Sequence, residues 1–251
     1  MKAGIPVNEN LRLEHELWQK NQELERITEA QRRIISIIAH DVRSPLSSIV
    51  SLFQLYRNRM IDPDRVNNFL NVSTAQLHCT MALLENLVEW GKIQVQSPSL
   101  ASNLLSLKEL VDGVFTELTV QASLKNNRLV NETSDSVRLY MDEHIVRFML
   151  RNLVTNANKF TEEGRITVDG FNFEKKVIIR VADTGIGMPA RMVERLFLNK
   201  DKYSRRGTQN ESGSGLGLIL IREFVDKAGG SIKVQSIEGR GSSFIIELPL
   251  N

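Results

Sequence analysis

Near the start of this 251-residue chain, apolar residues recur at alternating steps of four and three residues. Leucine or isoleucine fills six of the eight positions of this seam: Leu13, Leu17, Leu24, Ile27, Ile34 and Ile38. Such a repeat is typical of a coiled coil, in which helices bury a narrow apolar seam against each other. We therefore expect a coiled-coil helix over residues 1–33. A single amphipathic helix lying on a globular core is the alternative.

The apolar stripe then continues in a different rhythm. From Ile34 to Leu46 the steps are four, four and four, a stutter that locally unwinds a left-handed supercoil. The stutter lies around His40, and Pro45 favours a kink there. Residues 61–64 read as a turn, and a second apolar stripe follows over residues 66–88. This pattern predicts a helical hairpin over residues 34–96. Because one hairpin cannot bury so much apolar surface, we expect it to dimerise into a four-helix bundle.

Glycine usage changes near residues 97–99, since thirteen of the fifteen glycines follow them. We place a linker at residues 97–103 and a second domain at residues 104–251. Its patterns alternate between helical and strand-like periods, which predicts a multidomain chain of α and α+β parts, the second an α/β sandwich. The expected helices cover residues 107–125, 142–160 and 215–228. The expected strands cover residues 128–131, 137–140, 166–173, 176–182, 231–236 and 243–248, in a mostly antiparallel sheet.

Composition excludes several classes of protein. The chain is 41% apolar and 25% charged, which is ordinary for a folded domain. Its net charge of +2 is too balanced to predict nucleic-acid binding. Cys79 is the only cysteine, so a disulfide framework is excluded within one chain and a reducing, cytoplasmic compartment fits. No apolar run approaches the roughly 20 residues of a membrane helix, so we expect any membrane segment or sensor on another part or partner.

Three polar strings carry candidate chemistry in the second half. Asn152 and Asn156 lie four residues apart on one face of an expected helix, and Lys159 lies within a turn of them. Amide oxygens are hard ligands suited to Mg²⁺, which usually takes its remaining ligands from water and substrate phosphates. Lys159 can reach a phosphate. An exposed polar helix face would give the same pattern.

The other two strings are rich in glycine. Asp183-Thr-Gly185-Ile-Gly187 follows an expected strand, and its glycines let the backbone approach a ligand closely. A fixed carboxylate at this position can accept a hydrogen bond from the exocyclic amine of adenine. Gly213-Ser-Gly215-Leu216-Gly217 opens an expected helix, whose first backbone N–H groups form an anion site. It is neither a P-loop nor a dinucleotide fingerprint. Taken singly, each string is also compatible with an ordinary turn.

In this order the three strings resemble the N, first-glycine and second-glycine boxes of the GHKL, or Bergerat-fold, ATPases. That superfamily includes DNA gyrase, mismatch-repair ATPases, heat-shock chaperones and histidine kinases. Upstream, Ala39-His40-Asp41-Val-Arg43-Ser44-Pro45-Leu46 resembles the H box of histidine kinases, and the tail from Gly239 to Phe244 resembles their C-terminal end. The resemblance covers about residues 30–251 and implies the catalytic core of a two-component sensor histidine kinase.

The resemblance also implies roles for single residues. His40 would accept the γ-phosphoryl group of ATP, and Asp41 would orient its imidazole or take its proton. Ser44 would orient water for a modest phosphatase activity toward a response regulator. Asn156 and Asn152 would hold Mg²⁺. The remaining nucleotide-binding positions would be Lys159, Phe160, Asp183, Gly185, Gly187, Gly213, Gly215, Leu216 and Gly217. Residues 188–212 would form a polar lid over the nucleotide.

Partners follow from the same resemblance. We expect a homodimer that passes its phosphoryl group to the receiver domain of a separate response regulator. Two alternatives stay open. One is a GHKL ATPase or serine kinase that phosphorylates no histidine, and the other is a nucleotide-binding scaffold without catalysis.

Overall fold

The computed structural model describes the second half of the chain almost continuously and the first half in short pieces. The described residues are 14–15, 17–22, 25, 28, 42–43, 46–51, 53–58, 66–67, 69–74, 77, 80–81, 84–85, 87–88, 91, 103–198, 205–209, 211 and 216–250. Contacts divide the chain into two compact units, Met1–Ser73 and Thr74–Asn251.

The described residues before position 92 are helical, apart from a turn at Asn58. This agrees with the helices expected over the coiled-coil and hairpin segments. The turn at 61–64 lies outside the described residues, and so does almost all of the linker expected at 97–103. Within the described part of the chain, no helix is long and apolar enough to cross a membrane.

The α/β part is built on a five-stranded sheet of order β2-β4-β5-β7-β6. Its strands are β2 (Arg128–Asn131), β4 (Arg165–Phe173), β5 (Lys176–Asp183), β7 (Gly241–Pro249) and β6 (Ser231–Ile237). Only β2 and β4 pair in parallel, while the other neighbours are antiparallel. A separate two-stranded sheet joins β1 (Asn103–Ser106) to β3 (Arg138–Met141). The expectation of a mostly antiparallel sheet is confirmed.

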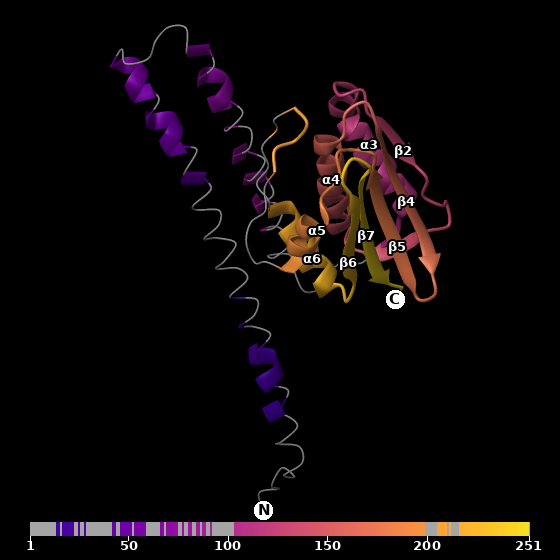
Figure 1. Ribbon diagram of the computed structural model, residues 1–251. Coiled ribbons are helices and arrows are strands. Elements are labelled where there is room, and N and C mark those ends of the chain that lie inside the picture. Colours follow the sequence, from indigo (N-terminus) through magenta and orange to yellow (C-terminus); the bar gives the residue numbers. More distant parts are fainter. Residues whose placement is uncertain are drawn as a thin grey trace, which may run out of the picture. The chain divides into compact units, whose positions relative to one another are not determined.

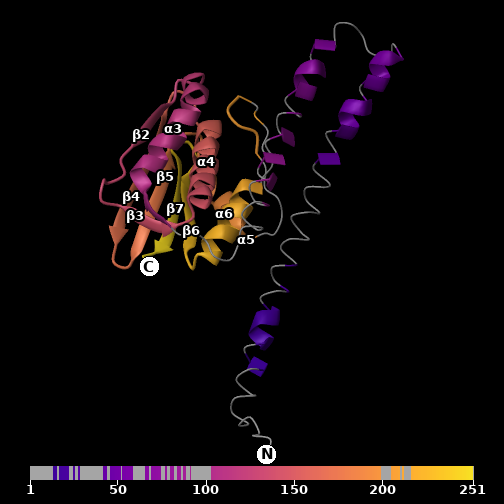
Figure 2. The ribbon, with the colours of Figure 1, turned by 180° about the vertical axis from the view of Figure 1, so that it is seen from behind.

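Three helices lie on the same side of the five-stranded sheet (Figure 1 and Figure 2). They are α3 (Leu107–Ser123), α4 (Glu143–Phe160) and α6 (Leu216–Lys227), and a shorter helix, α5 (Ala190–Leu198), packs beside β6. The strands present alternate residues to the helices. On β5, for example, Val177, Ile179 and Val181 are buried, whereas Lys176 and Arg180 are exposed. This period of two is what a sheet with one covered face requires.

The helix layer is held together by large apolar side chains. Leu150 and Leu153 of α4 and Leu220 of α6 are almost completely buried. The rings of Phe148 and Phe224 meet edge to face, with 5.5 Å between their centroids, and so join α4 to α6. Because α4 lies between α3 and α6 and also contacts β4 and β5, its C-terminal end is held from several sides.

The structure adds two elements that the sequence patterns did not predict. Strand β1 occupies residues that we assigned to the linker and the start of the next domain. Its pairing with β3 is made more than thirty residues further along, so no local pattern reports it. Helix α5 lies within the stretch interpreted as a polar lid. Its nine residues are too few for a clear helical period among so many charged side chains.

The N-terminal end of α4 generates a stability prediction. Asp142 accepts hydrogen bonds from the backbone N–H groups of His144 (2.7 Å) and Ile145 (3.3 Å). Asp142→Ala should lower the free energy of unfolding by about 1 kcal/mol, because two helical donors lose their partner. Ser106→Ala is the control, since Ser106 caps α3 through one 3.5 Å bond and should cost less. Urea unfolding followed by circular dichroism measures both, and equal losses would contradict the prediction.

Candidate functional site

Asp183 ends β5 and is held in place by two backbone groups from different segments. Its Oδ1 accepts the N–H of Gly185 at 2.9 Å and the N–H of Ser242, from β7, at 3.2 Å. Burial raises the pKa of this carboxyl, and the two N–H groups oppose the rise. The chain thus keeps a carboxylate in a largely buried position where it is fixed in orientation. Such a group is suited to accept a hydrogen bond from a ligand.

The glycines after Asp183 allow close packing of backbone on backbone. A Cβ at Gly185 would overlap the carbonyl oxygen of Phe160, and the next N–H, of Ile186, donates to that same oxygen at 3.0 Å. Gly187 has a φ of +60°, and a Cβ there would overlap the carbonyl oxygen of Ile237. The loop therefore lies pressed between the end of α4 and the β6–β7 hairpin, as a glycine string permits.

Three residues around Asp183 were missed by the sequence interpretation. Gly241 has a φ of +105°, and a Cβ there would overlap the carbonyl oxygen of Asp183. Ser242 follows it and supplies the N–H that orients Asp183. Thr161 is completely buried next to Gly185, and a hydrogen bond from its side chain lowers the pKa of Asp183, which places its hydroxyl beside that carboxylate. The glycines at 239 and 241 were a usable signal for the first two, whereas nothing local marks Thr161.

A buried hydroxyl beside an oriented carboxylate offers both a donor and an acceptor to a polar ligand. The fit to adenine is chemical: the base offers an amine donor to Asp183 and ring acceptors to a hydroxyl. The pair Asp183 and Thr161 is therefore suited to a nucleotide base.

The asparagines of α4 face different surroundings. The Asn152 side chain donates to the carbonyl of Phe148 at 2.9 Å, and its Oδ1 lies against α6, where a Cβ on Gly217 would approach it to 2.5 Å. Asn152 thus packs α4 against the start of α6. Asn156, one turn later, is half buried and its side chain makes no hydrogen bond with any described residue. Its amide oxygen is the better placed of the two for a metal ligand.

The candidate residues that the structure describes come together around the end of α4. Lys159 lies in its last turn, with its ammonium 4.9 Å from the centre of the Phe160 ring. Leu216 is buried at the first position of α6, and Gly217 contacts Asn152 from there. The remaining candidates, His40, Asp41, Ser44, Gly213 and Gly215, lie outside the described residues.

Among the described residues, no three His, Cys, Asp or Glu side chains come close enough to hold a metal ion. Helix α4 offers amide oxygens as ligands, and the neighbouring lysine can pair with phosphate but not with a metal. Such oxygens fit Mg²⁺ that takes most of its ligands from phosphate oxygens and water, rather than a metal caged by protein.

Comparison with known proteins extends this picture. Residues 141–251 match the family described as histidine kinase-, DNA gyrase B- and HSP90-like ATPase. The sensor histidine kinase YclK of Bacillus subtilis is 29% identical over 99% of this chain, and RcsC of Escherichia coli is 27% identical over 98%. The match covers 53% of YclK and 26% of RcsC, so the chain spans about half or less of these relatives.

Solved structures agree with the sequence matches. The catalytic domain of histidine kinase ThkA is 28% identical, with a TM-score of 0.51 over 59% of this chain and 96% of that one. ThkA in complex with the response regulator TrrA gives a TM-score of 0.67 over 98% of this chain and 68% of that one. At 23% identity the second likeness supports the fold alone.

The fold and the site define an ATPase domain of the histidine kinase, DNA gyrase B and HSP90 type over residues 141–251. The sequence matches continue through the helical half. Over nearly its whole length the chain is therefore similar to sensor histidine kinases, in agreement with its motifs.

Asp183 generates a prediction with two opposite effects. Asp183→Asn should weaken ATP binding about tenfold or more, because the amide can turn a donor toward the adenine amine. The same change should raise the melting temperature of the nucleotide-free protein at pH 7, since it removes a charge whose burial is unfavourable. The amide oxygen can still accept the N–H groups of Gly185 and Ser242.

The pH dependence follows from the sign of the shift. A carboxyl whose pKa is raised by folding binds its proton more tightly in the folded state, so stability falls as the pH rises above about 4. The higher melting temperature of Asp183→Asn should disappear at lower pH, because the native carboxyl is then protonated and uncharged as well. Asp169→Asn is the control: it breaks a 2.6 Å ion pair with Arg180 and should lower stability. Calorimetry measures ATP binding and thermal melts measure stability in both variants. Unchanged ATP binding in Asp183→Asn would exclude the adenine role.

Proposed function

We propose that the chain is an ATP-dependent protein histidine kinase of a two-component system. ATP would phosphorylate His40, and the phosphoryl group would pass to an aspartate of a response regulator. The observation that carries the proposal is that the glycine loop after Asp183 and the start of α6 both pack against α4, the helix of Asn152 and Asn156, in an ATPase-type domain. The same chain carries an H-box-like string around His40.

The binding step would use the described site. Asp183 accepts the adenine amine, and the glycine loop of Gly185 and Gly187 forms the wall beside it. Lys159 and the N–H groups at the start of α6 face the phosphates, with Gly217 allowing them close to α4. Bound Mg²⁺, held by Asn156 with Asn152 as the weaker candidate, would neutralise phosphate charge.

The transfer step would take place at His40. One imidazole nitrogen attacks the γ-phosphorus, the bond from that phosphorus to the bridging oxygen of ADP breaks, and ADP leaves. The proton on the other nitrogen of the attacking imidazole is taken by Asp41, or Asp41 orients the ring through a hydrogen bond. The carboxylate of the regulator's aspartate then attacks the phosphorus of phosphohistidine, the phosphorus–nitrogen bond breaks, and aspartyl phosphate forms while His40 is released.

Dimerisation would complete the helical part. In the single chain, Phe53 is 66% exposed, Tyr56 61% and Leu70 50%, although all three belong to the predicted apolar stripes. Such side chains gain free energy when a second copy covers them, roughly 25 cal/mol per Å² of apolar surface. This supports a four-helix bundle of two hairpins.

Two relatives support the regulator as partner. ThkA has been crystallised with the response regulator TrrA, and LuxQ of Vibrio harveyi, 26% identical, is named a sensor kinase/phosphatase. The alternative function, an ATPase or serine kinase without phosphohistidine, is favoured by no described contact. The alternative of a silent scaffold would require losses in the nucleotide strings, and these are intact in the sequence.

The decisive test is the chemistry of the labelled product. With labelled ATP and Mg²⁺, the native protein should acquire a phosphate that acid removes and alkali does not. His40→Gln should acquire none, because no nucleophile remains at that position, while its ATP affinity stays native. Label on His40→Gln, or acid-stable label on the native protein, would contradict the proposal and favour the serine-kinase alternative.

The reverse reaction gives a second prediction. Ser44 lies four residues after His40, on the same helical face in the predicted helix. Its hydroxyl can orient water toward the regulator's phosphoaspartate, but it lacks the methyl group that stiffens χ1 in threonine. Ser44→Ala should therefore lower the phosphatase rate and Ser44→Thr should raise it, each with little effect on autophosphorylation. The measurement is loss of phosphate from a purified cognate regulator with ADP present. Equal rates in all three proteins would mean that Ser44 is only a small residue before Pro45.

A further inference from the structure

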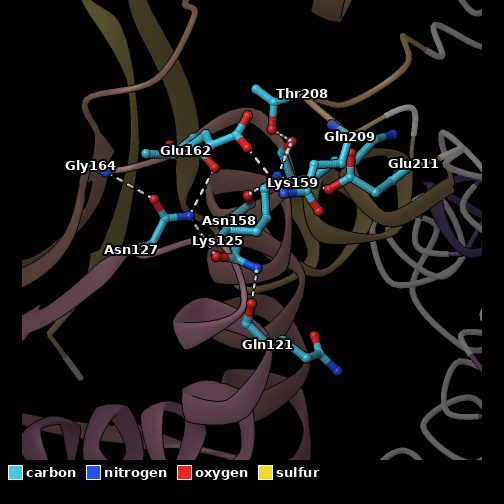
Figure 3. A network of polar contacts seen from close by, with 11 residues as sticks. Gln121, Lys125, Asn127, Asn158, Lys159, Glu162, Gly164, Thr208, Gln209 and Glu211 are labelled. Carbon is cyan, nitrogen blue, oxygen red and sulfur yellow. Dashed lines mark hydrogen bonds and ion pairs between the residues drawn. The ribbon is translucent and has the colours of Figure 1, made fainter.

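Lys125 has an unusual environment for a lysine. It follows α3 in the turn that leads to β2, and only 4% of its surface is exposed. Its ammonium donates to the carbonyl oxygens of Asn158 (2.8 Å) and Lys159 (2.9 Å) and to Oε1 of Glu211 (2.7 Å). Figure 3 shows these three acceptors converging on it. An ammonium has three N–H donors, so all three are used.

The charge balance of this site depends on Glu211. Two of the acceptors are neutral carbonyls from the C-terminal end of α4, where a positive charge is favourable but not neutralised. A buried ammonium needs an anionic partner, and the partner here is the Glu211 carboxylate, which is partly exposed. Burial alone would raise the pKa of Glu211, but the hydrogen bond and the charge of Lys125, together with backbone hydrogen bonds from Glu211 and Gln209, outweigh it, and the pKa lies below its ordinary value.

Glu211 belongs to neither a helix nor a strand. With residues 205–209 it lies against the end of α4, where the N–H of Thr208 donates to the carbonyl of Lys159 at 3.1 Å. The carboxylate also closes its own turn, since Oε2 accepts the N–H of Gln209 at 2.8 Å. A Cβ on Gly207 would come within 2.6 Å of the Lys159 carbonyl oxygen, so the segment packs closely.

The same segment also contacts the first glycine loop. Arg205 donates from Nη1 to the carbonyl oxygen of Gly187 at 3.2 Å. Residues 205–209 and 211 therefore touch both parts of the candidate nucleotide site, the last turn of α4 that carries Lys159 and the loop after Asp183. Five residues beyond Glu211 in the sequence, α6 begins at Leu216.

We infer that Lys125 and Glu211 form a positioning pair for the nucleotide site. The pair fixes residues 205–209 and 211 on the last turn of α4 and holds that turn, with Lys159, in the geometry that receives the phosphates. The inference rests on the proposed function in one respect, that the ligand is ATP. Neither residue touches ATP. They act through the backbone of Lys159 and through the segment that leads toward α6.

The first test breaks the charge pair with the least change of shape. Glu211→Gln keeps a side chain of the same size but leaves Lys125 without a neutralising partner. Amide exchange at Gly207, Thr208 and Gln209 should speed up about tenfold in the nucleotide-free full chain, because the segment undocks more often. The affinity for a non-hydrolysable ATP analogue should fall about tenfold, with a smaller loss for ADP, which lacks the third phosphate. KM for ATP should rise with little change in kcat.

A second variant and a matched control separate positioning from general stability. Lys125→Met removes the ammonium, and in the double variant with Glu211→Gln the two effects on ATP affinity should not add, since either change breaks the same pair. Asp135→Asn breaks an ion pair of equal length, 2.7 Å to Lys108, on the exposed surface of the same domain. It should change neither the exchange at residues 207–209 nor the affinity.

The outcomes are distinct for the two proposals. Unchanged amide exchange in Glu211→Gln would overturn the inference. Faster exchange with unchanged ATP affinity would also overturn it, since the pair would then be a structural contact without a positioning role. Equal losses of affinity for ATP and ADP would also overturn it. If the native protein bound no ATP, the proposed function would fail, whereas docking of residues 205–209 and 211 by the pair would still stand or fall on the exchange measurement.

Discussion

The last carbonyl groups of α4 have no partners inside the helix, and the candidate site is built from the groups that satisfy them. Every α-helix leaves its final carbonyls unpaired. Here Asn158 and Lys159 receive the Lys125 ammonium, Lys159 also receives the N–H of Thr208, and Phe160 receives the N–H of Ile186. These donors come from the turn after α3, the segment before α6 and the first glycine loop. One helix end thus sets the positions of three segments that are far apart in the sequence.

One feature of the site is unfavourable for folding. Burial of the Asp183 carboxylate raises its pKa, although hydrogen bonds from Gly185, Ser242 and Thr161 oppose the rise, so its charged form is disfavoured in the folded state. This cost is tolerated because α4 is anchored in the core through residues such as Leu150 and Leu153. A ligand that donates a hydrogen bond to Asp183 would recover part of the cost, and such recovery is a source of binding energy.

The sequence predicted the parts of this site that are local and failed where contacts are not local. Helix α4, β5 and the start of α6 were placed to within one or two residues, because their apolar periods are clear. The approach of Gly217 to Asn152 could be anticipated only from the resemblance, since 65 residues separate them. Gly241 and Ser242, which support Asp183, lie in a hairpin whose pairing with β5 decides their place. Lys125 looked like an ordinary charged residue at a helix end, and only its three acceptors give it a role.

The two halves of the chain bury their apolar side chains in different ways, and this bears on how each half becomes stable. In the α/β part, Ile166, Ile179 and Ile246 are at most 1% exposed within a single chain, so its core is complete without a partner. In the described residues of the helical part, apolar stripe positions such as Phe53 and Leu70 are half exposed or more. A fold completed by a second copy gains stability with protein concentration, whereas a self-contained domain does not. The α/β part can therefore keep the geometry of its candidate site independently of association, whereas the described helices have apolar surface that a partner could cover.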